Sequence, residues 1–131
     1  MKEIAIKENH LYRKTFQRGK RWSGRYVTVS VLKDLAAKKL MRANPQKKYV
    51  NRIGLSVPKK EDGAIGRNRT KRIIREALRH IVKEGRLKTG WLIVISSRPT
   101  ASGAKSTDIE NDLRYIFKKL DMLESREEHS K

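Results

Sequence analysis

The chain has 131 residues, with 33 Lys and Arg against 14 Asp and Glu, so its net charge at pH 7 is +19. Most of this excess lies in residues 1–60, and it predicts a polyanionic partner for that half and the segment after it. A hydrophobic fraction of 37% is enough for one modest core, while the absence of cysteine excludes thiol nucleophiles, disulfides and cysteine-based zinc sites.

No run approaches the roughly 20 apolar residues of a membrane-spanning helix, and we expect neither an export signal nor a lipid anchor. We therefore expect no membrane partner and a cytoplasmic location, with which the lack of cysteine agrees. A single domain over residues 1–131 is predicted, with an ordered core from about residue 7 to 123 and loose termini.

The first predicted element is a short helix from about Asn9 to Arg18, with Asn9 as a possible cap and Gly19 as the stop. Tyr12 and Phe16 are one turn apart, so the helix places both rings on one face. Trp22 follows among Lys20, Arg21 and Arg25, and the sequence leaves open whether it stacks on a base of a nucleic-acid partner or joins the core.

Residues 26–31 alternate strictly between valines and polar residues, as a half-buried strand does. The valines are expected on one face, and Tyr26, Thr28 and Ser30 on the other. For the segment from Lys33 to Tyr49, a helical turn and a long basic connection remain equally open. A second alternating strand is predicted at residues 50–58.

An amphipathic helix is predicted from Arg67 or Asn68 to about Lys83, after a glycine-bearing entry at residues 61–66. One side of this helix gathers the apolar stripe and the other a basic stripe, so the core fixes the helix while its cations point outward. The apolar stripe contains Ile73, Ile74, Ala77, Leu78, Ile81 and Val82. The basic stripe contains Asn68, Arg72, Arg75, Arg79 and Lys83.

The last two predicted elements are an interior strand and a closing helix. Residues 91–96 form an unbroken apolar run. The helix that follows opens with Thr107 as cap and Glu110 three residues on, and its apolar stripe runs from Ile109 to Leu120. The order helix, strand, strand, helix, strand, helix predicts an α+β sandwich with helices packed on one small sheet.

The sequence offers no catalytic residues with which the protein alone could cleave a nucleic-acid partner. Such chemistry needs clustered carboxylates for Mg²⁺ or a pair of histidines. The one acidic cluster, Asp108, Glu110 and Asp112, lies at a helix start, where a structural role is favoured. The histidines lie apart without ligand spacing, so we assign no metal ligand in this chain.

Three features together carry a resemblance to a known family. Arg52-Ile53-Gly54-Leu55-Ser56-Val57 leads into Lys59-Lys60; Arg67-Asn68-Arg69 opens the basic helix; and the apolar strand and closing helix follow. In this order and spacing, from about residue 7 to 120, the chain resembles the protein component of bacterial ribonuclease P.

The resemblance implies an α-β-β-β-α-β-α sandwich with a left-handed βαβ crossover. A third early strand is then needed, either near Lys20–Ser23 or within residues 33–49. It also implies an accessory subunit of an endoribonuclease that removes the 5′ leader of precursor tRNA. The partners would be the catalytic RNA, which holds the catalytic centre and most of the Mg²⁺, and the precursor; no organic cofactor and no protein partner is expected.

Carried over by residue, the resemblance implies two RNA-binding surfaces. The leader would run in a cleft between the first helix and the exposed sheet face, lined by Tyr12, Phe16, Tyr26 and Ser30. Ser30 stands where the family often has an aromatic residue, a contact that Tyr26 would replace. The catalytic RNA would meet Lys59, Lys60, Arg67, Asn68, Arg69, Lys71, Arg72 and Arg75.

Two readings stay open beside this one. Glu61 and Asp62 depart from the family's usual approach to the arginine triplet, and we interpret them as solvated loop acids rather than cation ligands. The alternative to a ribonuclease P subunit is a structural RNA-binding protein of the ribosomal kind with no role in catalysis.

Overall fold

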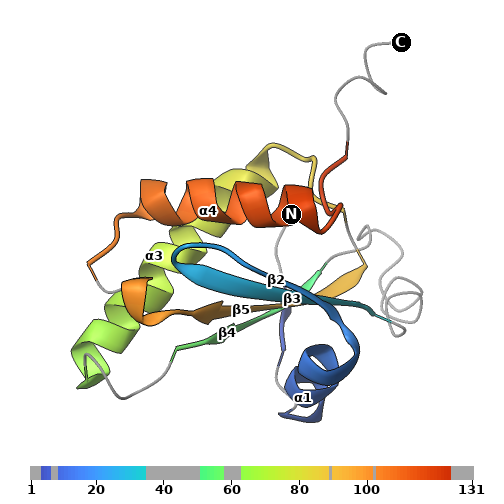
Figure 1. Ribbon diagram of the computed structural model, residues 1–131, viewed down its shortest axis with the longest axis horizontal. Helices are drawn as coiled ribbons and strands as arrows, with labels where there is room; N and C mark the ends of the chain where they lie inside the picture. Colours follow the sequence, from blue (N-terminus) through green and yellow to red (C-terminus); the bar gives the residue numbers. More distant parts are fainter. Residues whose placement is uncertain are drawn as a thin grey trace.

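A computed structural model describes residues 4–6, 9–34, 51–57, 63–88, 90–101 and 103–124. These residues form one mixed sheet with helices on both faces (Figure 1). None of the helices in this part of the chain combines the length and the apolar character that a membrane span needs.

The sheet has five strands in the order β1-β4-β5-β3-β2. β4 runs parallel to β1 and β5, whereas β3 runs antiparallel to β5 and β2. The strands are β1 (Ile4–Ala5), β2 (Lys20–Ser23), β3 (Val27–Lys33), β4 (Arg52–Ser56) and β5 (Trp91–Ser97).

Helix α1 (Asn9–Arg18) covers one face of the sheet, and α3 (Gly63–Lys83) and α4 (Ser106–Lys119) lie together on the other (Figure 1). A 3₁₀ turn at Pro99–Ala101 precedes α4. The described elements after the short β1 therefore follow the order α-β-β-β-α-β-α, which confirms the predicted sandwich. The left-handed crossover between the parallel strands β4 and β5 remains an expectation from the resemblance.

The central strand β5 supplies side chains to a core on each face of the sheet, because successive residues of a strand point to opposite faces. Ile93 and Ile95 join the main core beneath α3 and α4. Leu92 and Val94 join a smaller core with Ile6, against which Leu11, Tyr12 and Leu32 pack. Both faces of β5 are therefore covered, as its unbroken apolar run predicts.

The structure settles two predictions about the first half of the chain. The third early strand is β2, at Lys20–Ser23, which is one of the two places proposed for it. The prediction of a loose N-terminus is wrong for residues 4–6, because Ile4–Ala5 pair with β4 and Ile6 is only 6% exposed, whereas residues 1–3 lie outside the described residues. Most of the segment from Lys33 to Tyr49, which the sequence left undecided, lies outside the described residues.

Both helices on the main core begin earlier than predicted. α3 starts at Gly63 instead of Arg67 or Asn68, so the glycine-bearing entry forms its first turns. The cap of α4 is Lys105 and not Thr107, and the Lys105 N–H donates to the Asp108 carboxylate at 3.1 Å. The predicted apolar stripe of α4 is nonetheless buried throughout, because a shift of the first turn does not change which face packs on the sheet.

Candidate RNA interface

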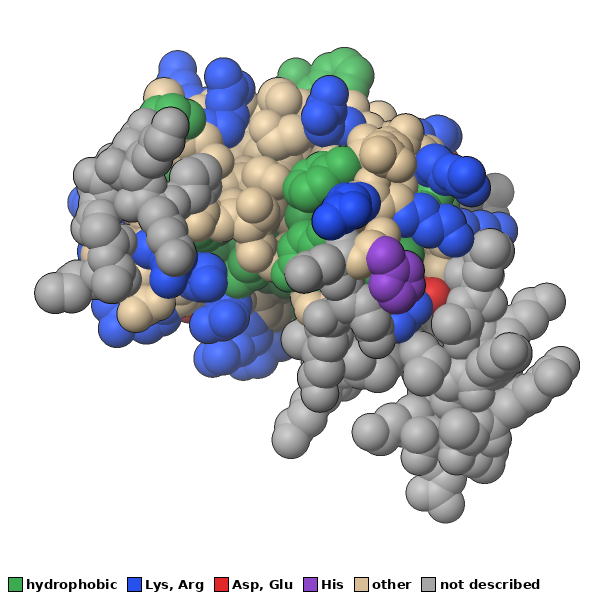
Figure 2. All heavy atoms as spheres, turned by 90° about the horizontal axis from the view of Figure 1, so that it is seen from below, with side chains coloured by type: hydrophobic (Ala, Val, Ile, Leu, Met, Phe, Trp, Pro, Cys, Tyr) green, Lys and Arg blue, Asp and Glu red, His purple; other side chains and the backbone are tan. Residues whose placement is uncertain are grey.

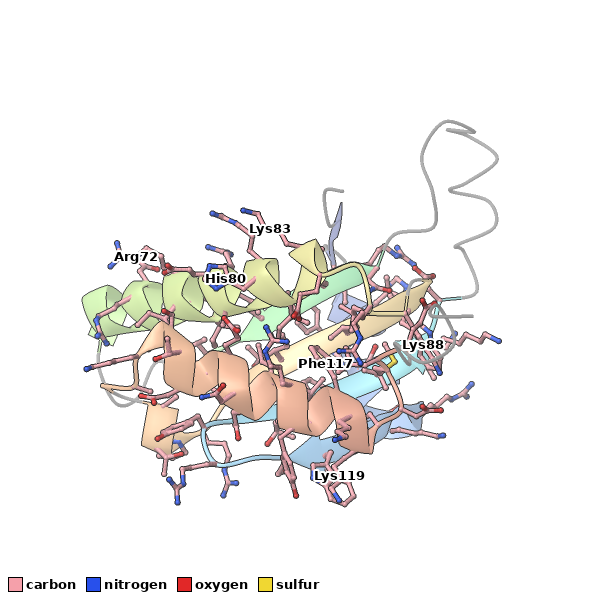
Figure 3. All side chains as sticks on the ribbon, turned by 90° about the horizontal axis from the view of Figure 1, so that it is seen from above. Arg72, His80, Lys83, Lys88, Phe117 and Lys119 are labelled. Carbon is pink, nitrogen blue, oxygen red and sulfur yellow. The ribbon has the colours of Figure 1, made fainter. Side chains whose placement is uncertain are left out.

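The basic face of α3 consists of side chains that the helix presents to solvent while its opposite face packs in the core. Ile74, Ala77 and Ile81 are at most 1% exposed, as the predicted apolar stripe requires. The basic face is exposed and comprises Asn68, Arg69, Arg72, Arg75, Arg79 and Lys83. Figure 3 shows Arg72 and Lys83 on the side of α3 away from α4. The helix thus holds these cations in a fixed row.

The arginines of this face are available to an outside partner. Among the described residues, the ion pairs involve other groups, and no carboxylate pairs with Arg69, Arg72, Arg75 or Arg79. Glu76 is the one acidic residue of α3. Unpaired cations on a rigid helix repel one another, and an anion that bridges them removes that cost.

Two of the predicted contacts differ from the rest. Arg67 is half-buried, because residue 67 falls close to the core-facing side of α3, and its Nε is enclosed with no hydrogen-bond partner among the described residues. Lys71 is also half-buried. Lys59 and Lys60 lie outside the described residues, as do Glu61 and Asp62.

On the other side of the sheet, α1 carries the aromatic pair Tyr12 and Phe16. The Tyr12 ring lies directly on Gly54 of β4, in space that a Cβ at residue 54 would occupy. Thr15 is fully buried and its hydroxyl donates to the Leu11 carbonyl at 2.7 Å, which orients the inner side of the helix. Phe16 remains 38% exposed at the surface. The helix therefore holds one ring against the sheet and one in solvent.

The other two residues predicted to line this surface do not lie on it. Ser30 points toward α1, but it is 1% exposed and its hydroxyl has no partner in the described structure, so α1 covers it. Tyr26 packs against the main core of α3 and α4, on the opposite side from Tyr12. It precedes β3, so the alternation of the strand does not extend to it. Tyr26 therefore cannot replace an aromatic contact at Ser30.

The surface around α1 is basic and apolar at once. Figure 2 shows this side of the molecule, where Lys and Arg side chains gather around a patch of hydrophobic side chains. On α1 itself, Arg13, Gln17 and Arg18 are exposed beside Phe16. A surface of this kind suits unpaired nucleotides, whose bases stack on aromatic rings while cations neutralise the phosphates.

The acidic cluster at the start of α4 is structural. The Asp112 carboxylate accepts the backbone N–H groups of Arg25, Tyr26 and Val27 at 2.9–3.1 Å and so holds the β2–β3 turn on α4. Asp108 caps the helix. Within the described residues, no group of three His, Asp or Glu side chains is placed to hold a metal ion.

Glu110 connects the two helices of the main core. It accepts from Arg114 at 2.7 Å and lies 2.8 Å from His80 Nδ1, while Arg114 also pairs with Glu84 at the end of α3. The hydrogen bond from Arg114, with a smaller effect of His80, lowers the pKa of the Glu110 carboxyl below its ordinary value of 4.5. The same bond raises the pKa of Arg114.

Comparison with known proteins decides the family. The family model of ribonuclease P matches residues 1–121. The chain belongs to the ribonuclease P protein family. It is 32% identical over 123 residues to the ribonuclease P protein component of Clostridium acetobutylicum, covering 94% of this chain and 93% of that protein. For the Clostridioides difficile protein the identity is 31%, covering 90% and 92%.

Solved structures of ribonuclease P proteins share the fold. The Staphylococcus aureus protein superposes with a TM-score of 0.72 at 24% identity, covering 93% of this chain and 99% of that one. The Thermotoga maritima protein gives 0.67 at 22% identity, covering 91% and 97%. Family membership makes the chain an accessory subunit of an endoribonuclease and implies partnership with the ribonuclease P RNA. The ribosomal-type alternative is not favoured.

Sequence reasoning about this ribonuclease P protein missed two positioning residues. Gly54 has a recognisable signal, since a glycine inside a strand often marks the close approach of another group. Asp112 has none, because its partners lie 85 to 87 residues away along the chain.

Proposed function

We propose that this subunit docks on the catalytic RNA through the basic face of α3 and holds the 5′ leader of precursor tRNA along α1. The observation that carries the proposal is the separation of the two surfaces: a row of exposed cations on one side of the sheet and a basic, aromatic surface on the other. One small protein can then contact two RNA segments at once.

The chemistry of each surface matches its proposed partner. Arginine forks bind phosphate oxygens in two places, so Arg69, Arg72 and Arg75 suit the backbone of a folded RNA. Asn68 is exposed at the same end and can meet a ribose or a base edge. In our proposal Lys59, Lys60, Arg67 and Lys71 add positive charge to this contact.

The leader is unpaired, so its bases are free to stack. Phe16 offers an exposed ring, and Tyr12, which is partly exposed, offers a ring that is fixed on Gly54. Stacking of this kind accepts any base, as a subunit serving many precursors requires. Arg13 and Arg18 neutralise the adjacent phosphates.

Cleavage itself is assigned to the RNA partner, which binds the Mg²⁺ ions. Bound Mg²⁺ would supply the activated water and stabilise the leaving oxygen. The donor set of the described residues does not form a site for it, since Asp108, Glu110 and Asp112 are engaged in the fold. The protein's cations reduce repulsion between two RNA molecules, so less Mg²⁺ is needed. We place this activity in the cytoplasm, where precursor tRNA is made.

Leader removal from precursor tRNA at low Mg²⁺ tests the proposal, with catalytic RNA alone, protein alone and both together. We expect cleavage only in the mixture and recovery of RNA-only cleavage at high Mg²⁺. Cleavage by protein freed of RNA would overturn the assignment of the catalytic centre. A mixture no faster than RNA alone at every salt concentration would overturn the accessory role.

A further inference from the structure

A third surface with RNA-binding character lies at the edge of the sheet, on β2 and α4. Trp22 of β2 is 41% exposed and Tyr115 of α4 is 49% exposed, which makes them two of the three exposed large hydrophobic residues in the described structure. Lys119 Nζ lies 5.9 Å from the centre of the Trp22 ring and 5.7 Å from that of Tyr115. We call these three residues the Trp22 patch.

The Trp22 patch is not part of the core. Trp22 pairs with Val29 across the strands, so it faces the α4 side of the sheet, yet it is 41% exposed and does not belong to the main core. An exposed tryptophan and an exposed tyrosine lose the stabilisation that burial of such large rings would otherwise supply. The sequence left two roles open for Trp22, packing in the core and stacking on RNA. The exposure of its side chain excludes the core role.

The fold fixes the geometry of the patch. The Asp112 carboxylate binds the N–H groups of the turn that follows β2, and Tyr115 lies three residues further along the same helix. Strand and helix are therefore tied together next to the two rings. Because the rings are already positioned, a base that stacks on them costs little ordering entropy.

The charge around the patch favours an anion. Lys20, Lys118 and Lys119 are all exposed on these two elements. Of the acidic residues nearest in sequence, Asp112 binds the turn, and Asp121, which follows α4, lies 3.4 Å from Lys88. Aromatic rings beside exposed lysines match unpaired RNA, whereas the basic face of α3, which has no aromatic side chain, matches a phosphate backbone.

The position of β2 indicates which RNA reaches the patch. β2 is an edge strand that follows α1 after a single residue, and all four of its residues are exposed. Arg21 is opposite Ser30 and so lies on the α1 side, whereas Trp22 lies on the α4 side. An RNA strand that extends beyond Phe16 can therefore cross the edge of the sheet beside Arg21 and reach Trp22. Figure 3 shows Lys119 on the far side of α4 from Arg72 and Lys83.

We infer that the Trp22 patch is a second site for unpaired RNA, which binds the distal nucleotides of a long precursor leader after it has crossed the edge of β2. The inference rests on the proposed leader-binding function and extends it. It assigns the patch to the substrate and not to the catalytic RNA, because the patch lies across the molecule from the basic face of α3.

The test compares two precursor tRNAs on the reconstituted holoenzyme. One leader is short and ends on the α1 surface; the other is longer by about ten unpaired nucleotides, within the usual range for single-stranded sites. We expect Trp22→Ala to weaken binding of the long-leader substrate about fivefold or more and to leave the short-leader substrate unchanged. Trp22→Phe should keep most of the affinity, because a ring remains.

Two further variants sharpen the result. Lys119→Gln should lower both the affinity for the long leader and its dependence on salt, since one phosphate contact is lost. Thr107→Ala changes an exposed residue at the other end of α4 and should change nothing. Circular dichroism and thermal unfolding of each variant establish that it is folded.

Several outcomes would overturn the inference. An equal loss on both substrates, or weaker assembly with the catalytic RNA, would assign the patch to RNA docking; a change in sedimentation of the free protein would assign it to self-association. If the wild type favours the long leader and Trp22→Ala keeps that preference, the inference of a second site is refuted, while the proposed leader surface on α1 stands. If Phe16→Ala also leaves every leader effect intact, the proposed function fails with it.

Discussion

The ring of Tyr12 on α1 occupies the place that a side chain would take at Gly54 on β4. This contact sets the distance between α1 and the sheet, and with it the position of Phe16 one turn further along the helix.

Gly54→Ala should therefore destabilise the protein by about 1–3 kcal/mol, because the added methyl group overlaps the Tyr12 ring. Urea unfolding measures the effect. In a Tyr12→Ala background the same substitution should cost much less, since the overlap is gone. Equal costs in the two backgrounds would show that the ring does not set this spacing.

Phe16→Ala should weaken binding of leader-bearing precursor tRNA by about 1–3 kcal/mol, the usual cost of losing one stacked base. Binding of mature tRNA should not change. Thr107→Ala is the control, because Thr107 is exposed on α4, on the other face of the sheet. Should Phe16→Ala act equally on precursor and mature tRNA, α1 is not the leader surface.

Arg72→Ala and Arg75→Ala should each weaken binding of the catalytic RNA and lower the slope of log affinity against log salt by about one. Thermal stability should stay within about 0.5 kcal/mol, because both side chains are exposed and unpaired in the described structure. Glu76→Gln, on the same helix, should bind RNA at least as tightly as the wild type. An unchanged salt slope in both arginine variants would contradict the docking assignment.

Asp112→Asn should destabilise the fold by about 2–3 kcal/mol, because an amide cannot accept three backbone N–H groups as a carboxylate does. Chemical denaturation measures the loss. Asp108→Asn is the control and should cost less, since its single partner is exposed. If the two variants lose the same amount, the turn does not depend on this carboxylate.

Glu110 should make stability depend on pH. Its pKa is lowered in the folded state, so its contribution is complete above the ordinary value of 4.5 and is lost as the pH falls through the lowered pKa. The effect should stay below about 1 kcal/mol, because the network is partly exposed. Unfolding at neutral and acidic pH, for wild type and Glu110→Gln, measures it; a variant as pH-dependent as the wild type would refute the linkage.

Periodicity predicted the parts of the fold that bury a regular face. The stripe of α3 and the two sides of β3 follow from 3.6-residue and two-residue repeats, and both are observed. Periodicity did not reveal β2 without the resemblance, because a four-residue edge strand with every side chain exposed has no pattern. It also placed the start of α3 too late, since Gly63 and Gly66 suggested a loop and the packing of the helix overrides that local preference.

The site was predicted where it depends on local spacing and missed where it depends on distant contacts. Phe16 and the exposed arginines of α3 follow from helix geometry. The positions of Ser30 and Tyr26 could not be predicted from local spacing. The whole fold decides that Ser30 is buried beneath α1 and that Tyr26 packs against the main core.

The place of β5 between β3 and β4 has a consequence for how the protein is made. β3 and β4 do not pair with each other; each pairs with β5. Until residues Trp91 to Ser97 have left the ribosome, the two early fragments of the sheet are therefore not connected. The strongly basic first half of the chain therefore gains a common sheet only after β5 has been synthesised.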